Sequence, residues 1–160
     1  MTVVVLTETE REFLLEARRI ILCTTATDGS PRPVPACFAL VEDMVAGTRL
    51  YTPLDEKPKN TGDPHLLARV RDIGARPVVS LLVDRWSEDW VRLAWLRLIG
   101  SATLLEPDGG AGRVGEHAIA VAALRARYPQ YARHDLSARP VIRVTLTRAL
   151  SWGRLAEVIE

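Results

Sequence analysis

Hydrophobic and polar residues follow two rhythms along this chain, and the first of them predicts a helix. Thr7 and Glu10 form an S/T-x-x-E pattern, in which the hydroxyl and the carboxylate satisfy free amide groups at a helix start. Apolar residues then recur at helical spacing from Phe13 to Ile20 or Ile21. The chain therefore opens with a helix that has one apolar face.

The second rhythm consists of short runs rich in β-branched and apolar residues, which predict strands. Asp28 and Gly29, between the first two runs, are a hairpin signal because glycine tolerates the positive φ of tight turns. Gly100 predicts a bulge or bend within the longest run. The predicted strands cover residues 21–27, 34–41, 49–52, 78–83, 91–105 and 141–147, and residues 151–155 form a terminal turn or short strand.

Two more helices interrupt these strands. Asp63 and Pro64 have the character of an N-cap and a first helical position, and the apolar stripe after them ends at Gly74. The alanine-rich residues 116–127 predict the other helix. Because strands and helices do not alternate regularly, a parallel βαβ sheet is disfavoured. We therefore predict a mainly β fold, an antiparallel barrel with peripheral helices, which residues 1–160 form as a single domain.

Composition narrows the function classes. The 160 residues are 48% hydrophobic and 26% charged, which suits one globular domain with its own core. A net charge of +1 removes the electrostatic argument for nucleic-acid binding. Cys23 and Cys37 form neither a CxxC pattern nor a dense framework, so a reduced, cytoplasmic protein is expected. The apolar start at residues 1–6 is too short to span a membrane, and no membrane partner is expected.

The loop after the third predicted strand carries two lysines. Lys57 and Lys59 lie on either side of Pro58, shortly after Tyr51 and Thr52. Ammonium groups offer point charges to a phosphate dianion, so this pair is a candidate phosphate clamp. A solvated surface loop explains the same pattern.

Patterns for metal binding and nucleophilic catalysis do not occur. His65, His117 and His134 lie far apart in the sequence and form no cluster of ligand spacing, so we expect no metal site. There is no GxSxG pattern, and neither cysteine has a histidine partner nearby in the sequence. No catalytic residue is assigned from the sequence. Tyr51, close to the lysine loop, is the nearby candidate for a proton donor, and solvent is the alternative.

A likeness to known proteins rests on the order of several short motifs. After the first helix come residues 26–35, then Leu50-Tyr51-Thr52, the Lys-x-Lys loop, residues 76–83 and residues 97–100. In this order, over roughly the whole chain, the sequence resembles the pyridoxamine 5′-phosphate oxidase-like family, also called FMN-binding split barrels. Arg-Tyr-Pro-Gln-Tyr at 127–131 and Trp-Gly-Arg at 152–154 are most similar to its branch of deazaflavin (F420)-dependent oxidoreductases.

This resemblance implies a split antiparallel β-barrel that forms a homodimer, with flavin-type cofactors in the grooves between subunits. It implies that a Tyr-Thr pair touches the cofactor and that the lysine loop holds the cofactor's phosphate. Trp95 stands where the oxidases have a cofactor-binding glutamine, which favours a different cofactor or a stacking role. Trp152 and Arg154 stand where the partner subunit contributes such residues, and interface packing is the alternative. The residues implied in cofactor binding are Tyr51, Thr52, Lys57, Lys59, Asn60, Trp95, Trp152 and Arg154.

The implied function is that of an oxidoreductase that uses F420, or alternatively FMN, to transfer hydride to or from a small conjugated substrate. The cofactor would carry the chemistry, and the protein would orient it and exclude water. The longer basic set with which the oxidases bind pyridoxal phosphate has no counterpart in this sequence, so that activity is not expected. The alternative is a carrier of the same fold that binds a flavin, deazaflavin or tetrapyrrole without turnover.

Overall fold

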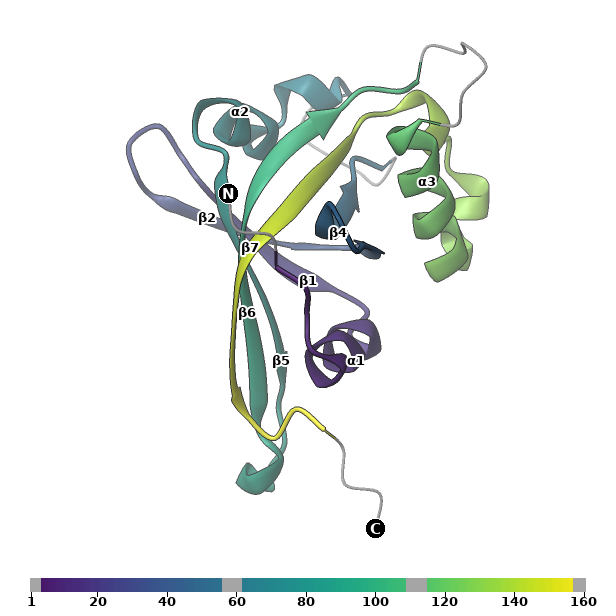
Figure 1. The fold of residues 1–160 in the computed structure, drawn as a ribbon. Coiled ribbons are helices and arrows are strands. Elements are labelled where there is room, and N and C mark those ends of the chain that lie inside the picture. The colour runs from purple at the N-terminus through teal and green to yellow at the C-terminus, as the bar shows by residue number, and fades with distance from the viewer. Residues whose placement is uncertain (1–3, 56–61, 109–114, 157–160) are drawn as a thin grey trace.

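The structure, a computed structural model, describes residues 4–55, 62–108 and 115–156. Within these residues, seven strands form one sheet (Figure 1). The strands are β1 (Ile20–Thr25), β2 (Pro31–Ala36), β3 (Ala39–Asp43), β4 (Gly47–Pro53), β5 (Val78–Arg85), β6 (Ala94–Leu105) and β7 (Val141–Gly153). The α-helices are α1 (Glu8–Glu16), α2 (Ala68–Ala75) and α3 (Glu116–Arg127), and the 3₁₀ helices are η1 (Pro64–Leu66), η2 (Trp90–Arg92), η3 (Pro129–Arg133) and η4 (Leu136–Ala138).

Neighbouring strands of the sheet are antiparallel, in the order β2-β1-β5-β6-β7-β4-β3. The two edge strands, β2 and β3, follow one another in the chain across Cys37 and Phe38. The sheet therefore curls into a barrel whose two edges are joined by a covalent link. Figure 1 shows β5, β6 and β7 continuing beyond this barrel as a long twisted ribbon that ends at η2.

Three prolines explain why β2 lies at an edge. Pro31, Pro33 and Pro35 alternate along this strand, and none of them can donate to a ladder. β2 pairs with β1 on one side through its register of six residue pairs. Its other side has few amide donors, which protects the edge from pairing with another strand.

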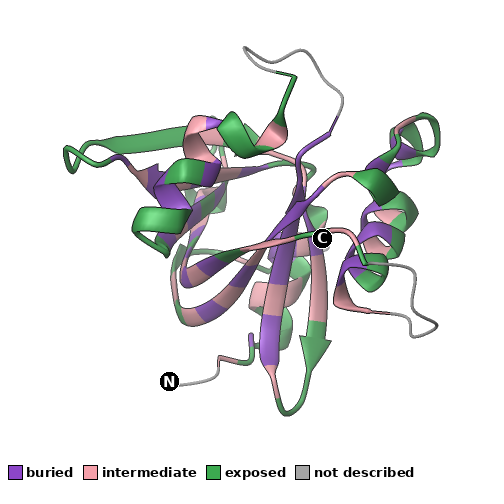
Figure 2. Cartoon of the chain, turned by 90° about the horizontal axis from the view of Figure 1, so that it is seen from above, coloured by how far each residue is buried: buried purple, intermediate pink, exposed green. Residues whose placement is uncertain are grey.

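Aliphatic side chains from the strands fill the barrel interior, and two helices close it. Phe13 and Leu14 of α1 and Val70 and Ile73 of α2 belong to this core. Figure 2 shows buried and more exposed residues following one another along the strands, as expected for a sheet with one face inward. Burying one such side chain contributes roughly 1.5–3 kcal/mol, so this core is the main source of stability.

A second, smaller core lies between the outer face of the sheet and α3. Ala120, Val121 and Leu124 of α3 pack with Tyr51 of β4 and Ala39 of β3. α3 therefore covers the outer face of β3, β4 and the start of β7. No helix in the described part of the chain is both long and apolar enough to cross a membrane.

The capping box and the bulge predicted from the sequence are confirmed. Thr7 Oγ1 accepts the amide of Glu10 at 3.2 Å, and the Glu10 carboxylate accepts the amide of Thr7 at 2.9 Å. The register between β6 and β7 shifts between Ile99 and Gly100. A Cβ at Gly100 would lie 2.6 Å from the Thr145 carbonyl oxygen, so glycine allows this close approach.

Five predicted boundaries are wrong, and one of them is the start of the second helix, because Pro64 begins η1 and α2 begins only at Ala68. The single strand at 34–41 is two strands, because the Phe38 amide leaves the ladder and donates to the Tyr128 hydroxyl at 3.0 Å. The first helix ends at Glu16, since residues from Ile20 onward pair with β2. The long strand begins at Ala94 because residues 90–92 form η2. β7 does not end at residue 147 but continues to Gly153, where a terminal turn or a separate short strand was expected, because it pairs with β6 along its length.

Candidate functional site

The outer face of β1, β2, β5 and β6 contains a hollow of about 570 Å³. It lies on the face of the sheet opposite the barrel core, where alternate side chains of each strand point outward. We call it the outer-face hollow. It is lined by Ile21, Cys23, Pro33, Ser80, Leu81, Leu82, Asp84, Trp95 and Arg97.

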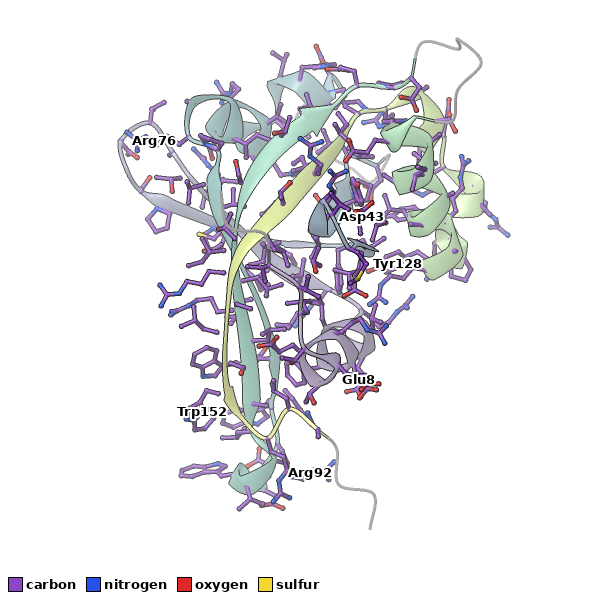
Figure 3. The ribbon with its side chains drawn as sticks, in the orientation of Figure 1. Glu8, Asp43, Arg76, Arg92, Tyr128 and Trp152 are labelled. Atoms are coloured by element: carbon purple, nitrogen blue, oxygen red, sulfur yellow. The ribbon has the colours of Figure 1, made fainter. Side chains whose placement is uncertain are left out.

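Two of the predicted site residues, Trp95 and Trp152, are cross-strand neighbours, and one of them lies in this hollow. They are paired across β6 and β7 in the strand register, and Trp95 lines the hollow itself. Trp152 is 54% exposed and points away from the barrel, on the side of the ribbon opposite α1 (Figure 3). The guanidinium carbon of Arg97 lies 5.6 Å from the centre of the Trp95 ring. Flat indoles with an adjacent cation form a surface on which a conjugated ring can stack.

Gly153 and Arg154 complete this end of β7. Gly153 has φ +81°, and a Cβ at this position would collide with the carbonyl oxygen of Leu93. The Arg154 amide donates to the same carbonyl oxygen at 3.2 Å, and Arg85 donates to the Arg154 carbonyl oxygen at 3.2 Å. The Trp-Gly-Arg sequence therefore holds Trp152 against β6 through a turn that requires glycine.

Tyr51 and Thr52 lie in a different part of the molecule and are each 1% exposed. As neighbours on β4 they point to opposite faces of the sheet. Tyr51 belongs to the core beneath α3, so Thr52 points toward the barrel interior. The structure therefore does not bring these two side chains to a common ligand surface, and their predicted contact with a cofactor stays a prediction.

The Tyr51 hydroxyl is part of a charged cluster at the start of α3. It donates to Glu116 Oε1 at 2.8 Å. Arg49 donates to the same oxygen at 3.0 Å, and Arg143 donates to Oε2 at 2.8 Å. Burial, followed by the hydrogen bond from the hydroxyl to Glu116, raises the pKa of Tyr51 to about 12. A hydroxyl held in this way is a poor proton donor at neutral pH.

The strand register separates these two groups of predicted residues. Tyr51 pairs with Arg143 of β7, whereas Trp95 pairs with Trp152, nine residues further along the same strand. Nine residues of extended chain cover a contour of about 30 Å. This exceeds the reach of one ring system, so the two groups within a single chain do not surround the same ring.

The predicted phosphate clamp, Lys57, Lys59 and Asn60, lies outside the described residues. The residues just before it are firmly held. The buried carboxylate of Asp55 accepts a hydrogen bond from the Tyr131 hydroxyl at 2.7 Å, and the Leu54 carbonyl oxygen accepts one from Arg139 Nε. Burial, with Cys37 and Asp55 beside the hydroxyl, raises the pKa of Tyr131.

The Arg-Tyr-Pro-Gln-Tyr motif at residues 127–131 holds several segments of the fold together. The Tyr128 hydroxyl accepts the Phe38 amide and donates to the Arg18 carbonyl oxygen at 3.1 Å. Together with the bond from Tyr131 to Asp55, this ties the end of α3 to the β2–β3 link and to the end of β4.

The three histidines occupy separate sites. His65 lies between the carboxylates of Asp63 and Glu106, with nitrogen-to-oxygen distances of 3.0 and 2.7 Å. His117 is buried and its Nε2 lies 2.7 Å from the Arg139 carbonyl oxygen. Over the described ranges, no three His, Cys, Asp or Glu side chains are grouped so that they could hold a metal ion.

Sequence reasoning missed two parts of this arrangement. Arg97 lies two residues after Trp95 on a strand, and period-two alternation alone places both on the same face. Glu116 was recognised as the start of a helix, but its contacts with Arg49 and Arg143 join segments far apart in the sequence. Such contacts depend on strand register, for which a single sequence has no local signal.

The fold is similar to the folds of several solved structures. The conserved hypothetical protein Rv2991 from Mycobacterium tuberculosis superposes with a TM-score of 0.66 and 18% identity, over 96% of this chain and 88% of that one. HutZ, the heme storage protein from Vibrio cholerae, gives 0.59 and 16%, over 94% and 95%. A Clostridium acetobutylicum protein related to general stress protein 26, of the pyridoxinephosphate oxidase family, gives 0.54 and 14%, over 92% and 88%.

These structures confirm the predicted class, a mainly β split antiparallel barrel with peripheral helices. No curated protein sequence matches the chain. The family model described as pyridoxamine 5′-phosphate oxidase matches residues 6–153, nearly the whole length. The resemblance drawn from the order of short motifs is thus confirmed, and this chain belongs to the pyridoxamine 5′-phosphate oxidase family.

Proposed function

We propose that two copies of this chain hold a phosphate-bearing deazaflavin, F420, or alternatively FMN, between them, and that the site transfers hydride to or from a small conjugated substrate. The observation that carries this proposal is the outer-face hollow, which Trp95 and Arg97 line, with Trp152 opposite Trp95 on the next strand. Membership of an oxidase family supports the same class of chemistry.

The residues of the hollow fit a conjugated ring. A volume of about 570 Å³ lies within the range of roughly 300–1,000 Å³ that small-molecule sites occupy. Its walls combine apolar side chains with one indole, one guanidinium and one carboxylate, Asp84. Such walls offer apolar contact to a ring and leave a few polar groups to fix its orientation.

The cofactor, when bound, supplies the hydride chemistry. In this proposal Trp95 and Trp152 stack against the ring, and Arg97 holds positive charge beside it. Lys57 and Lys59 grip the phosphate. Because Tyr51 is buried and its pKa is raised to about 12, the proton that accompanies hydride transfer comes from solvent.

Two chains are needed because the two groups of predicted residues lie far apart in one chain. Tyr51, at the end leading to the lysine loop, is about 30 Å of strand from Trp152. A two-fold dimer supplies a second copy of each group, so one site can combine Trp152 of one subunit with the lysines of the other. This arrangement gives Trp152 and Arg154 their proposed role in the partner's site.

A carrier without turnover is the competing function, and a haem carrier is the less favoured form of it. HutZ, a heme storage protein, shares the fold at 16% identity. Among the described residues, those that line the hollow include no histidine, which is the usual haem ligand in binding proteins. The lining therefore favours a flavin-type ring over haem.

The test is a parallel titration of the full-length apo-protein with F420 and with FMN, followed by turnover of the reduced complex with an enone. We expect saturable binding of one cofactor, with an affinity about tenfold weaker in Trp95→Leu and Trp152→Leu, since stacking is worth on the order of 1 kcal/mol beyond area burial. Ile119→Leu, an exposed change on α3, is the control. Lys57→Ala with Lys59→Ala should weaken binding and reduce its salt dependence.

The outcomes separate the alternatives. Absence of binding for both cofactors would refute the proposal. Binding that is unchanged in both tryptophan variants would place the cofactor elsewhere. Tight binding without turnover across a panel of acceptors would establish the carrier instead of the enzyme.

A further inference from the structure

Two arginines of β7 each have another arginine beside them on a neighbouring strand. Arg143 lies beside Arg49 of β4, and we call these two the bridged pair. Arg148 lies beside Arg97 of β6, and we call these two the unbridged pair. Arg97 lines the outer-face hollow, and Arg49 lies two residues from Tyr51 in the core beneath α3. Both pairs are therefore on the outer face of the sheet.

The two pairs have the same diagonal relation between their strands. In each pair, the arginine outside β7 lies two residues before the residue that faces the β7 arginine in the strand register. The facing residue is Tyr51 in the bridged pair and Ile99 in the unbridged pair. Diagonal neighbours of this kind are about 7–8 Å apart, which long side chains can span. The two guanidinium groups of either pair can therefore reach one small acid group.

In the bridged pair, that acid group is the carboxylate of Glu116. Arg49 donates to Glu116 Oε1 at 3.0 Å, and Arg143 donates to Glu116 Oε2 at 2.8 Å. Each oxygen of a single carboxylate thus accepts from one guanidinium. Like charges on neighbouring strands repel each other, and a shared counter-ion offsets that repulsion with two charge-assisted hydrogen bonds.

The unbridged pair carries the same two charges without such a carboxylate. Arg97 and Arg148 are exposed, and across residues 4–55, 62–108 and 115–156 neither donates a hydrogen bond or lies within ion-pair distance of an acidic group. This holds also for Asp84, the carboxylate that lines the hollow. The guanidinium carbon of Arg97 lies 5.6 Å from the centre of the Trp95 ring. Stacking uses the flat face of a guanidinium, so its N–H donors stay available to a ligand.

The neighbours of the unbridged pair are apolar. Leu82 of β5 and Leu150 of β7 face Arg97 from either side in the strand register. Apolar neighbours lower the local dielectric, which strengthens a charge-assisted hydrogen bond once water is displaced. The hollow of about 570 Å³ beside Arg97 has room for a conjugated body. The ligand that matches this surface is therefore a carboxylate attached to a flat, apolar group.

We propose that the unbridged pair binds the carboxylate of a conjugated acid, as the bridged pair binds the carboxylate of Glu116. One oxygen of the ligand accepts from Arg97 and the other accepts from Arg148. The substrate class is then an α,β-unsaturated carboxylate, and a neutral enone is a poorer substrate. This inference rests on the proposed function, because it names the substrate class of the same site.

Binding by two arginines also favours the reduction of such an acid. Hydride adds to the β-carbon, the electron pair of the C=C bond moves toward the carboxylate, and a proton from solvent forms the new C–H bond at the α-carbon. The cofactor, which supplies the hydride, is oxidised in this step. A free carboxylate resists the addition because it already carries negative charge. Two guanidinium groups at its oxygens stabilise the additional charge as it develops.

The first test compares the binding of cinnamate with that of cinnamamide, which has the same conjugated body and no charge. Full-length protein is titrated with each probe by calorimetry at low salt, with and without oxidised cofactor. We expect cinnamate to bind at least tenfold more tightly, because the amide cannot form the charge-assisted contacts. Added salt should reduce this preference. Equal affinities for the two probes, or binding of neither, would overturn the inference.

The second test substitutes Arg148, which does not line the hollow itself. Arg148→Gln should reduce the preference for cinnamate to less than threefold, and Arg148→Lys, which keeps the charge but loses the planar fork, should show an intermediate preference. Arg133→Gln, an exposed change on η3 that removes the same charge, should keep the full preference. Circular dichroism and urea unfolding check that the variants fold. A preference that is unchanged in Arg148→Gln contradicts the proposal.

Cofactor measurements separate this inference from the function on which it rests. A preference for cinnamate that depends on Arg148, in a protein that binds neither F420 nor FMN, supports the carboxylate site and refutes the proposed function. Cofactor binding with turnover of an enone, and no preference for acids in binding or turnover, refutes the carboxylate site and leaves the function standing. If Arg148→Gln weakens cofactor binding as much as cinnamate binding, the arginines hold an acid group of the cofactor, and the substrate class is overturned.

Discussion

Substitution of Tyr51 by Phe tests the charged cluster beneath α3 through its pH dependence. The hydroxyl is buried and donates to Glu116 at 2.8 Å, and its pKa is raised from 10.0 to about 12. Hydrogen bonds to charged groups contribute about 1.5–3 kcal/mol, so Tyr51→Phe should lose about that much stability at pH 8. Because the folded pKa lies above the unfolded one, the protonated hydroxyl stabilises the fold fully below pH 10. That contribution is lost as the pH rises toward 12.

At pH 11, midway between the two pKa values, the free energy of unfolding of wild type should be about 1.4 kcal/mol lower than at pH 8 because Tyr51 ionises. The variant has no hydroxyl at residue 51 and should not show this loss. The gap in the free energy of unfolding between the two proteins should therefore narrow by that amount between pH 8 and pH 11. Urea unfolding at each pH measures the gap, and phenolate absorbance follows ionisation directly. In a Glu116→Gln background the narrowing should be smaller, since one cause of the raised pKa is removed. If the difference in the free energy of unfolding stays constant to pH 11, the proposed effect of burial and Glu116 on the pKa of Tyr51 is refuted.

Two further predictions concern single contacts. The pKa of His65 is raised by its hydrogen bonds to Glu106 and Asp63. Its stabilising effect on the fold is therefore present below about pH 6.5 and is lost as the pH rises through the higher folded pKa. An NMR titration should find a lower His65 pKa in Glu106→Gln, and an unchanged pKa would contradict the contact. Gly153→Ala should cost about 1–3 kcal/mol because of its positive φ and the Leu93 carbonyl oxygen. Gly74→Ala, with open space around the new methyl group, should be neutral or slightly stabilising by urea unfolding.

The order of elements was predictable because most of their boundaries have a local cause. The capping box at Thr7 and the glycine at the β6 bulge act within a few residues, and alternation within a strand needs no partner. The wrong predictions lie where a group distant in the sequence determines the local structure. The break at Phe38 depends on the Tyr128 hydroxyl, 90 residues away in the sequence, and the extension of β7 depends on β6.

The candidate site was predictable in part for the same reason. The resemblance pointed to Trp95 and Trp152 one at a time, and the register reveals that they are paired. It grouped Tyr51 and Thr52 as one contact, but alternation on a strand sends them to opposite faces. Lys57, Lys59 and Asn60 fall outside the described residues and stay predictions.

The outer face of the sheet is covered by a helix in one half and, among the described residues, is uncovered in the other. Over β3, β4 and the start of β7, α3 covers this face, and the charges of Arg49 and Arg143 are neutralised within the chain by Glu116. Further along the same face, around Trp95 and Trp152, no described helix plays the part of α3. Apolar side chains of this size gain roughly 25 cal/mol for each Å² removed from water, so covering them is favourable whichever chain supplies the cover. The half of the face around Trp95 and Trp152 is therefore the part of the described sheet that gains most free energy from burying further apolar surface.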